Sequence, residues 1–114
     1  MTSSKTKNTN NYPEYEISGF TEYDINIIHN YTIPKNLKTI TQPNAIGTVI
    51  HKDTNKIMGN ITPLIMVINA KRTMWREAVA YLVQIGADPD MMIEYYGRQT
   101  SAREIANTYR GGFP

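Results

Sequence analysis

The side chains that most often do chemistry are sparse in this sequence and form no catalytic or metal-binding pattern. The two histidines, His29 and His51, have no second ligand at a spacing that would hold a metal ion or support a general base. Cysteine is absent, which excludes disulfides, thiolate zinc sites and cysteine nucleophiles. These features predict a chain that is not an enzyme and carries no metal or other cofactor.

The acidic and glycine-containing stretches are interpreted as turns. Asp88 and Asp90 flank Pro89, but a calcium loop needs more oxygen ligands at a defined spacing. The glycines of GNITP (59–63) and YRGGFP (109–114) do not fall in the pattern of a phosphate-binding loop. No serine has the strand-turn-helix setting of a nucleophile elbow.

Lys71, Arg72 and Arg76 form a small basic cluster. The formal net charge is +2, and it is evenly divided. Residues 1–62 and residues 63–114 each contain six Lys/Arg and five Asp/Glu. A solvated basic surface is therefore favoured over a nucleic-acid contact, which would weaken steeply with salt.

Two amphipathic helices are predicted in the centre of the chain. The first starts at Thr62-Pro63, because the threonine hydroxyl can cap a helix and proline suits the first helical position. It is expected to run over 63–70 with Leu64, Val67 and Ile68 buried. A polar link leads to a second helix over 74–85, whose apolar stripe consists of Trp75, Ala78, Val79, Leu82 and Ile85.

The second helix has a strong stop signal. Gly86 can adopt the left-handed conformation that closes the last turn of a helix. Pro89 then prevents the helix from resuming and holds Asp88 extended. A sharp exit from the helix into extended chain is predicted.

The N-terminal third combines a polar tail with helical signals. Residues 1–11 are polar and are predicted to be disordered. A helix is expected over 20–33, with Thr21 as N-cap and Asp24 as its capping-box partner. Pro34 ends this helix or begins a short one that reaches Ile40. The apolar face of the first helix is predicted from Tyr23, Ile27, Ile28 and Tyr31.

A short hairpin or extended finger is predicted between these two regions. Val49 and Ile50, then Ile57 and Met58, flank a polar turn at 53–56.

TPLIMVI (62–68) and EAVAYLVQIGADPD (77–90) together resemble an ankyrin repeat. Thr62-Pro63-Leu64 matches the first-helix signature of that family, and Gly86–Asp90 matches the exit turn. Gly97 and SAREIA (101–106) resemble the first helix of a terminal repeat. The departures are Ile65 in place of the usual histidine, Val67 in place of a small residue, a longer link between the helices and a longer finger after Asp90.

The resemblance implies an all-α fold of short helix-turn-helix repeats with projecting hairpin or finger loops. A single domain over 12–114 is expected, with a clear repeat at 45–90 and a partial repeat at 91–110. About three repeats are normally needed to bury a core. Either an N-terminal helical cap over 12–44 or a partner must then cover the apolar edge of the repeat, and the cap is favoured because Tyr23, Ile27, Ile28 and Tyr31 offer an apolar face.

The finger after the exit turn is the main candidate for partner binding. Its composition is aromatic, methionine and arginine, which are residue types favoured in interfaces. The alternative is that these side chains pack back on the final half repeat. The predicted partner-binding residues are Met91, Met92, Glu94, Tyr95, Tyr96 and Arg98 in this finger, and Lys52, Asn55 and Lys56 in the preceding hairpin.

The predicted function is a non-enzymatic protein–protein interaction module of ankyrin type. By analogy with small ankyrin proteins, it would be a viral or bacterial protein that engages a host protein. The alternative is a structural subunit of a virion or ribonucleoprotein particle, and a nucleic-acid-binding protein is less favoured. No apolar run long enough to span a bilayer and no signal peptide are found, so a cytoplasmic protein, or one in the host cytoplasm or nucleus, is expected. Oligomerisation is left open.

Overall fold

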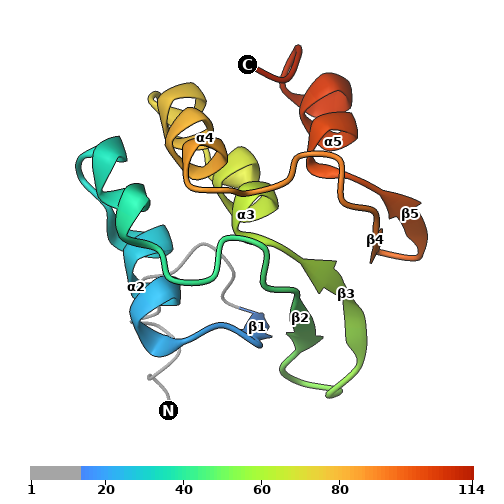
Figure 1. The fold of residues 1–114 in the computed structure, drawn as a ribbon. Coiled ribbons are helices and arrows are strands. Elements are labelled where there is room, and N and C mark those ends of the chain that lie inside the picture. The colour runs from blue at the N-terminus through green and yellow to red at the C-terminus, as the bar shows by residue number, and fades with distance from the viewer. Residues whose placement is uncertain (1–13) are drawn as a thin grey trace.

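The computed structural model describes residues 14–114. The predicted disordered tail at 1–11 and the predicted start of the domain at Tyr12 lie outside the described residues. The elements follow the order β1 (Tyr15–Ser18), α2 (Glu22–Asn30), η1 (Pro34–Thr39), β2 (Gly47–His51), β3 (Ile57–Ile61), α3 (Pro63–Asn69), α4 (Trp75–Gln84), β4 (Ile93–Tyr95), β5 (Arg98–Thr100) and α5 (Ala102–Tyr109) (Figure 1).

The fold is mixed α/β, so the prediction of an all-α, helical protein is wrong. The described chain contains a three-stranded antiparallel sheet of order β1-β2-β3 and a two-stranded sheet formed by β4 and β5. Segments that were expected to project as loops pair as strands instead. The strand β1 was not predicted from the sequence. It pairs with β2, so that Ile17 lies opposite Val49.

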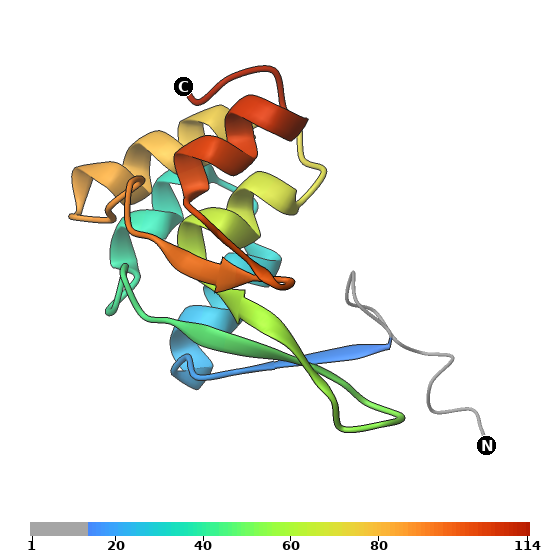
Figure 2. The ribbon, with the colours of Figure 1, turned by 90° about the vertical axis from the view of Figure 1, so that its right-hand side faces the viewer.

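The hairpin predicted before the first central helix is confirmed as β2 and β3. The His51 amide donates a hydrogen bond of 2.9 Å to the Lys56 carbonyl, and Asn55 closes the turn with a φ of 59°. Val49 is buried. The turn between β2 and β3 extends away from the helices (Figure 2).

α3 is the central helix of the molecule. It contacts α2, α4 and α5, and α4 also packs against η1 (Figures 1 and 2). Residues 22–40 thus pack against the two central helices. Ile28, Tyr31 and Leu37 belong to the same buried core as α3 and α4.

The predicted start of α3 is confirmed. Thr62 is the N-cap, and its hydroxyl accepts a hydrogen bond of 3.3 Å from the Ile65 amide. Leu64, Val67 and Ile68 are buried as expected. Ile65 and Met66 are buried as well, because neighbouring elements surround this helix.

The apolar stripe and the end of α4 are also confirmed. Trp75, Ala78, Val79 and Leu82 are buried. Gly86 has a φ of 110°, and the Ala87 amide donates a 3.0 Å bond to the Leu82 carbonyl. A Cβ on Gly86 would meet nothing within 4 Å, so the left-handed backbone is what requires glycine here.

Asn44 holds this exit turn from a distant part of the chain. Its Nδ2 donates a 2.8 Å bond to the Gly86 carbonyl, and its Oδ1 accepts a 2.7 Å bond from the Asp88 amide. The side chain therefore satisfies both a carbonyl and an amide that the end of the helix leaves unpaired.

The N-cap predicted for α2 is confirmed, but the capping box is wrong. Thr21 Oγ1 accepts a 3.0 Å bond from the Asp24 amide. The Asp24 carboxylate is directed toward the loop after η1, where it accepts bonds of 2.8 Å from the Thr41 amide and 3.0 Å from the Gln42 amide. Asp24 is fully buried and ties α2 to the segment after η1.

The predicted apolar face of α2 is only partly right. Ile28 and Tyr31 are buried and Ile27 is half-buried, but Tyr23 is 50% exposed. Asp24 occupies the buried position next to Tyr23, because its hydrogen bonds to the following loop compensate for the loss of water.

Candidate partner-binding face

The predicted finger after the exit turn is a short hairpin built from β4 and β5. Ile93 lies opposite Thr100, and Tyr95 opposite Arg98. The turn uses two positive φ angles, 51° at Tyr96 and 88° at Gly97. Glu94 Oε2 accepts a 3.0 Å bond from the Gly97 amide and so fastens the turn to its own strand.

The hairpin does not project freely, because it lies against β3. A Cβ added to Gly59 would fall 2.5 Å from the Tyr96 backbone nitrogen and 3.3 Å from its Cα. This close approach requires glycine at position 59.

The substitution Gly59→Ala is therefore expected to lower the free energy of unfolding by about 1–3 kcal/mol, because the backbone of the hairpin must move. Without the contact, alanine would be favoured over glycine in a strand, so the sign of the effect is diagnostic. Urea unfolding measures it, and Asn60→Ala on the same strand is the control. A Gly59→Ala variant as stable as the parent would show that the hairpin does not rest on β3.

The side chains predicted to bind a partner divide between two environments. Tyr95 is half-buried, and its hydroxyl accepts a 2.8 Å bond from Asn69 Nδ2 at the end of α3. Burial raises the pKa of the Tyr95 hydroxyl, which stays protonated at neutral pH. Met91 is also half-buried, whereas Met92, Glu94, Tyr96 and Arg98 are exposed.

The other three predicted binding residues lie apart from this hairpin. Lys52, Asn55 and Lys56 are exposed in the turn between β2 and β3, at the end of the sheet that is remote from the helices (Figure 2). The fold therefore does not gather all of the predicted binding residues at one place.

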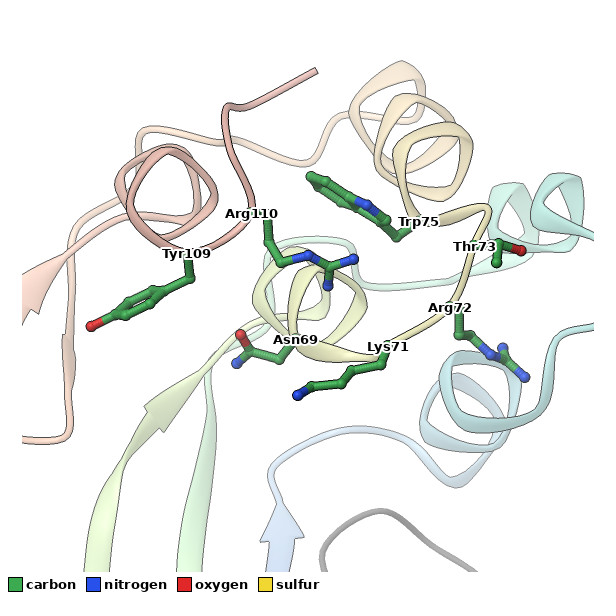
Figure 3. Close-up of a pocket in the computed structure, with 7 residues that line it drawn as sticks. All are labelled: Asn69, Lys71, Arg72, Thr73, Trp75, Tyr109 and Arg110. Atoms are coloured by element: carbon green, nitrogen blue, oxygen red, sulfur yellow. The ribbon is translucent and has the colours of Figure 1, made fainter.

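A pocket of about 760 Å³ opens where the C-terminal ends of α3 and α5 meet the link to α4 (Figure 3). We call it the basic pocket. It is lined by Asn69, Lys71, Arg72, Thr73, Trp75, Tyr109 and Arg110.

Arg110 is the most firmly held cation of the basic pocket. Its Nη1 donates bonds of 2.5 Å to the Ile68 carbonyl and 3.3 Å to the Ala70 carbonyl. Its guanidinium carbon lies 4.5 Å from the centre of the Trp75 ring. Carbonyls at the end of α3 attract this charge, which fixes its position.

Lys71 and Tyr109 form the accessible rim, and Tyr109 is 67% exposed. Arg72 is directed toward α2, where its guanidinium carbon lies 4.1 Å from the centre of the Tyr31 ring (Figure 3). Of the predicted basic cluster, Lys71 and Arg72 thus line the pocket. Arg76 lies beside it, 4.8 Å from the centre of the Trp75 ring.

The hairpin and the basic pocket are joined into one face by two contacts. The rings of Tyr95 and Tyr96 meet edge to face with centroids 4.7 Å apart. The Tyr95 hydroxyl is bonded to Asn69, which lines the pocket. Asn69, Tyr109 and Arg110 were not predicted from the sequence as part of a site. The signal that could have identified them is that each lies near the end of a predicted helix.

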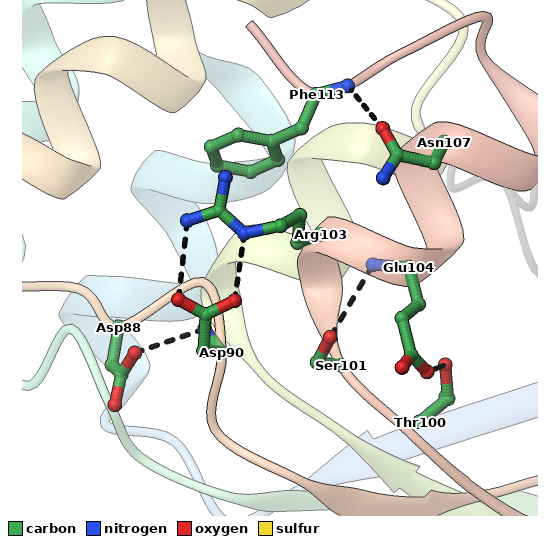
Figure 4. Close-up of polar contacts among 8 residues, drawn as sticks. All are labelled: Asp88, Asp90, Thr100, Ser101, Arg103, Glu104, Asn107 and Phe113. Atoms are coloured by element: carbon green, nitrogen blue, oxygen red, sulfur yellow. Dashed lines mark hydrogen bonds and ion pairs between the residues drawn. The ribbon is translucent and has the colours of Figure 1, made fainter.

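Of the two acidic residues in the exit turn, Asp90 pairs with α5 and Asp88 accepts a 2.9 Å bond from the Asp90 amide (Figure 4). Arg103 donates bonds of 2.7 and 3.1 Å to the two carboxylate oxygens of Asp90, and this pairing lowers the pKa of Asp90. The Arg103 guanidinium also lies 4.9 Å from the Phe113 ring. Ser101 caps the start of α5 by accepting a 3.3 Å bond from the Glu104 amide.

The two histidines lie on different elements. Burial, with the nearby charge of Arg72, lowers the pKa of His29 in α2. His51 meets the Tyr15 ring edge to face at 5.3 Å. Over residues 14–114, no group of three or more His, Cys, Asp or Glu side chains is arranged to hold a metal ion.

Comparison of the chain with models of protein families, with curated proteins and with solved structures gives no match. In the part of the chain that the structure describes, no helix has the length and apolar character needed to cross a membrane.

Proposed function

We propose that this chain is a non-enzymatic protein-interaction module of ankyrin type. Its binding face consists of the β4–β5 hairpin and the C-terminal ends of α3 and α5. The observation that carries the proposal is the continuous path from Tyr96 through Tyr95 and Asn69 to the basic pocket and Tyr109.

The order of elements supports the ankyrin type. The hairpin β2–β3 is followed by the helix pair α3 and α4, and the hairpin β4–β5 is followed by α5. Ahead of them, α2 contacts α3 and η1 contacts α4, as a preceding helix pair would do. A chain with about one and a half repeats obtains its missing neighbour in this way.

The composition of the face supports binding over catalysis. The lining of the basic pocket is three cations, an amide, a hydroxyl and two aromatic side chains. Tyrosine and arginine are enriched at the energetically important centres of protein interfaces. Tyr95 is held by Asn69 and Arg110 by α3, so a partner would meet side chains that are already ordered.

Affinity purification from a cell extract, read by quantitative mass spectrometry, tests the proposal. The tagged chain is expected to enrich a specific protein. The double change Tyr96→Ala with Tyr109→Ala is expected to reduce its recovery about tenfold or more. Tyr109 is 67% exposed and Tyr96 is 45% exposed, so the melting temperature is expected to change less than the recovery of the partner does.

The matched control is Tyr23→Ala, since Tyr23 is a half-exposed tyrosine on α2. Recovery of the partner with this variant is expected to equal that of the parent. Failure to enrich any protein, or equal recovery with the double variant, contradicts the proposed function.

A further inference from the structure

We infer that the basic pocket binds an acidic segment of a partner protein, through aspartate and glutamate carboxylates. This inference rests on the proposed function and names the chemistry of the partner.

No carboxylate of residues 14–114 forms an ion pair with the cations of the pocket. Lys71, Arg72 and Arg110 line it, and no aspartate or glutamate does. Across residues 14–114 the ion pair within 4.0 Å is that of Arg103 with Asp90, on another part of the surface. Arg72 faces α2 and lies over the Tyr31 ring, so Lys71 and Arg110 are the two cations that offer charge complementarity to an acidic ligand.

The arrangement of donors in the basic pocket favours the carboxylates of aspartate and glutamate. The bonds of Arg110 to the Ile68 and Ala70 carbonyls orient its guanidinium before any ligand arrives. Lys71 points to the same side as Asn69, whose amide has a second N–H besides the one bonded to the Tyr95 hydroxyl (Figure 3). A charge-assisted hydrogen bond to a pre-oriented cation is stronger than one to a mobile side chain.

A nucleic acid fits this surface less well. Non-specific strand binding uses a groove of cations along the phosphates and exposed rings on which the bases stack. One exposed ring, that of Tyr109, lines the pocket, whereas Trp75 is 6% exposed and its ring is already in contact with Arg76 and Arg110. The lysines of the β2–β3 turn lie at the far end of the sheet, so they do not extend the pocket into a groove.

The N-terminal segment of this chain does not have the required charge. Residues 1–13 contain two lysines and no acidic residue. The occupant that complements the pocket is therefore a segment of another protein.

The test is a selection of random-sequence peptides displayed on phage against the full chain. Selected peptides are expected to be enriched in aspartate and glutamate relative to the starting library. A fluorescently labelled selected peptide is then titrated by fluorescence anisotropy against the parent and two variants. Lys71→Glu is expected to weaken binding about tenfold or more, whereas Lys35→Glu on η1, the same charge change on an exposed lysine, is expected to alter it by less than about twofold. Circular dichroism checks that both variants are folded.

Three results overturn the inference. The first is a set of selected peptides without acidic enrichment, or no binding peptide at all. The second is equal weakening by Lys71→Glu and Lys35→Glu, which indicates a general charge effect. The third is a different occupant. It would be shown by tighter binding of single-stranded DNA than of the peptide, or by light scattering that detects a dimer of the chain which Lys71→Glu dissociates.

Failure of this inference is distinguishable from failure of the proposed function. If the extract protein is still recovered through Tyr96 and Tyr109 while acidic peptides do not bind, the proposed function holds and the acidic partner is wrong. If no protein is recovered and acidic peptides still bind at Lys71, the pocket is confirmed as a carboxylate site and the interaction module is contradicted.

Discussion

Leu82→Ala is expected to lower the free energy of unfolding by about 2–5 kcal/mol. Leu82 is fully buried on the stripe of α4, the helix that packs against both α3 and η1. Its removal leaves a cavity at the junction of the central helices with the N-terminal part of the chain. Domains of this size are stable by about 5–15 kcal/mol, so the variant is expected to lose a large share of its stability.

Urea unfolding followed by circular dichroism measures this loss. Val83→Ala is the control, because Val83 is the next residue of the same helix and is 38% exposed. Its effect is expected to stay within about 0.5 kcal/mol. Equal stability of Leu82→Ala and the parent would mean that this face of α4 does not line the core.

Asp24→Ala is expected to cost about 3 kcal/mol, because hydrogen bonds to a buried charged group contribute more than neutral ones. The Asp24 carboxylate accepts bonds from the Thr41 amide, the Thr41 hydroxyl and the Gln42 amide. Alanine would leave the two amides without their acceptor and detach α2 from the loop that follows η1. Urea unfolding is again the measurement.

A double-mutant cycle with Thr41→Ala separates this network from a general loss of charge. The two changes together are expected to cost less than the sum of the single costs, because they remove a shared hydrogen bond. Glu22→Ala is the matched control, as Glu22 is an exposed acidic residue in the first turn of the same helix. A cost for Asp24→Ala no greater than that for Glu22→Ala would contradict the role assigned to the buried carboxylate.

The strand β1 was missed for a physical reason that lies outside its own residues. Tyr15–Ser18 is short and carries a weak alternating pattern, and its backbone is satisfied by pairing with β2 across a loop and two helices. Nothing within a few residues of β1 specifies that partner. The all-α expectation failed here because strand pairing depends on residues distant in the chain.

Asp24 takes part in both a local contact and a distant one. Its position three residues after Thr21 suits a capping box, and the cap on the Thr21 side is present. The buried carboxylate nevertheless bonds to Thr41 and Gln42, which offer three donors. A local pattern predicted the helix start, whereas the direction of the side chain was decided by a distant loop.

The sequence by itself determined the features whose interactions close within one or two helical turns. These include the start of α3 at Thr62-Pro63, the buried stripe of α4 with Leu82, and the left-handed end at Gly86. The tertiary structure alone decided which side chains form the proposed binding face, because Tyr95 meets Asn69 and Arg110 joins Lys71 from separate elements. Capping and helical periodicity act between near neighbours, but a pocket exists only where the packing of whole elements brings distant side chains together.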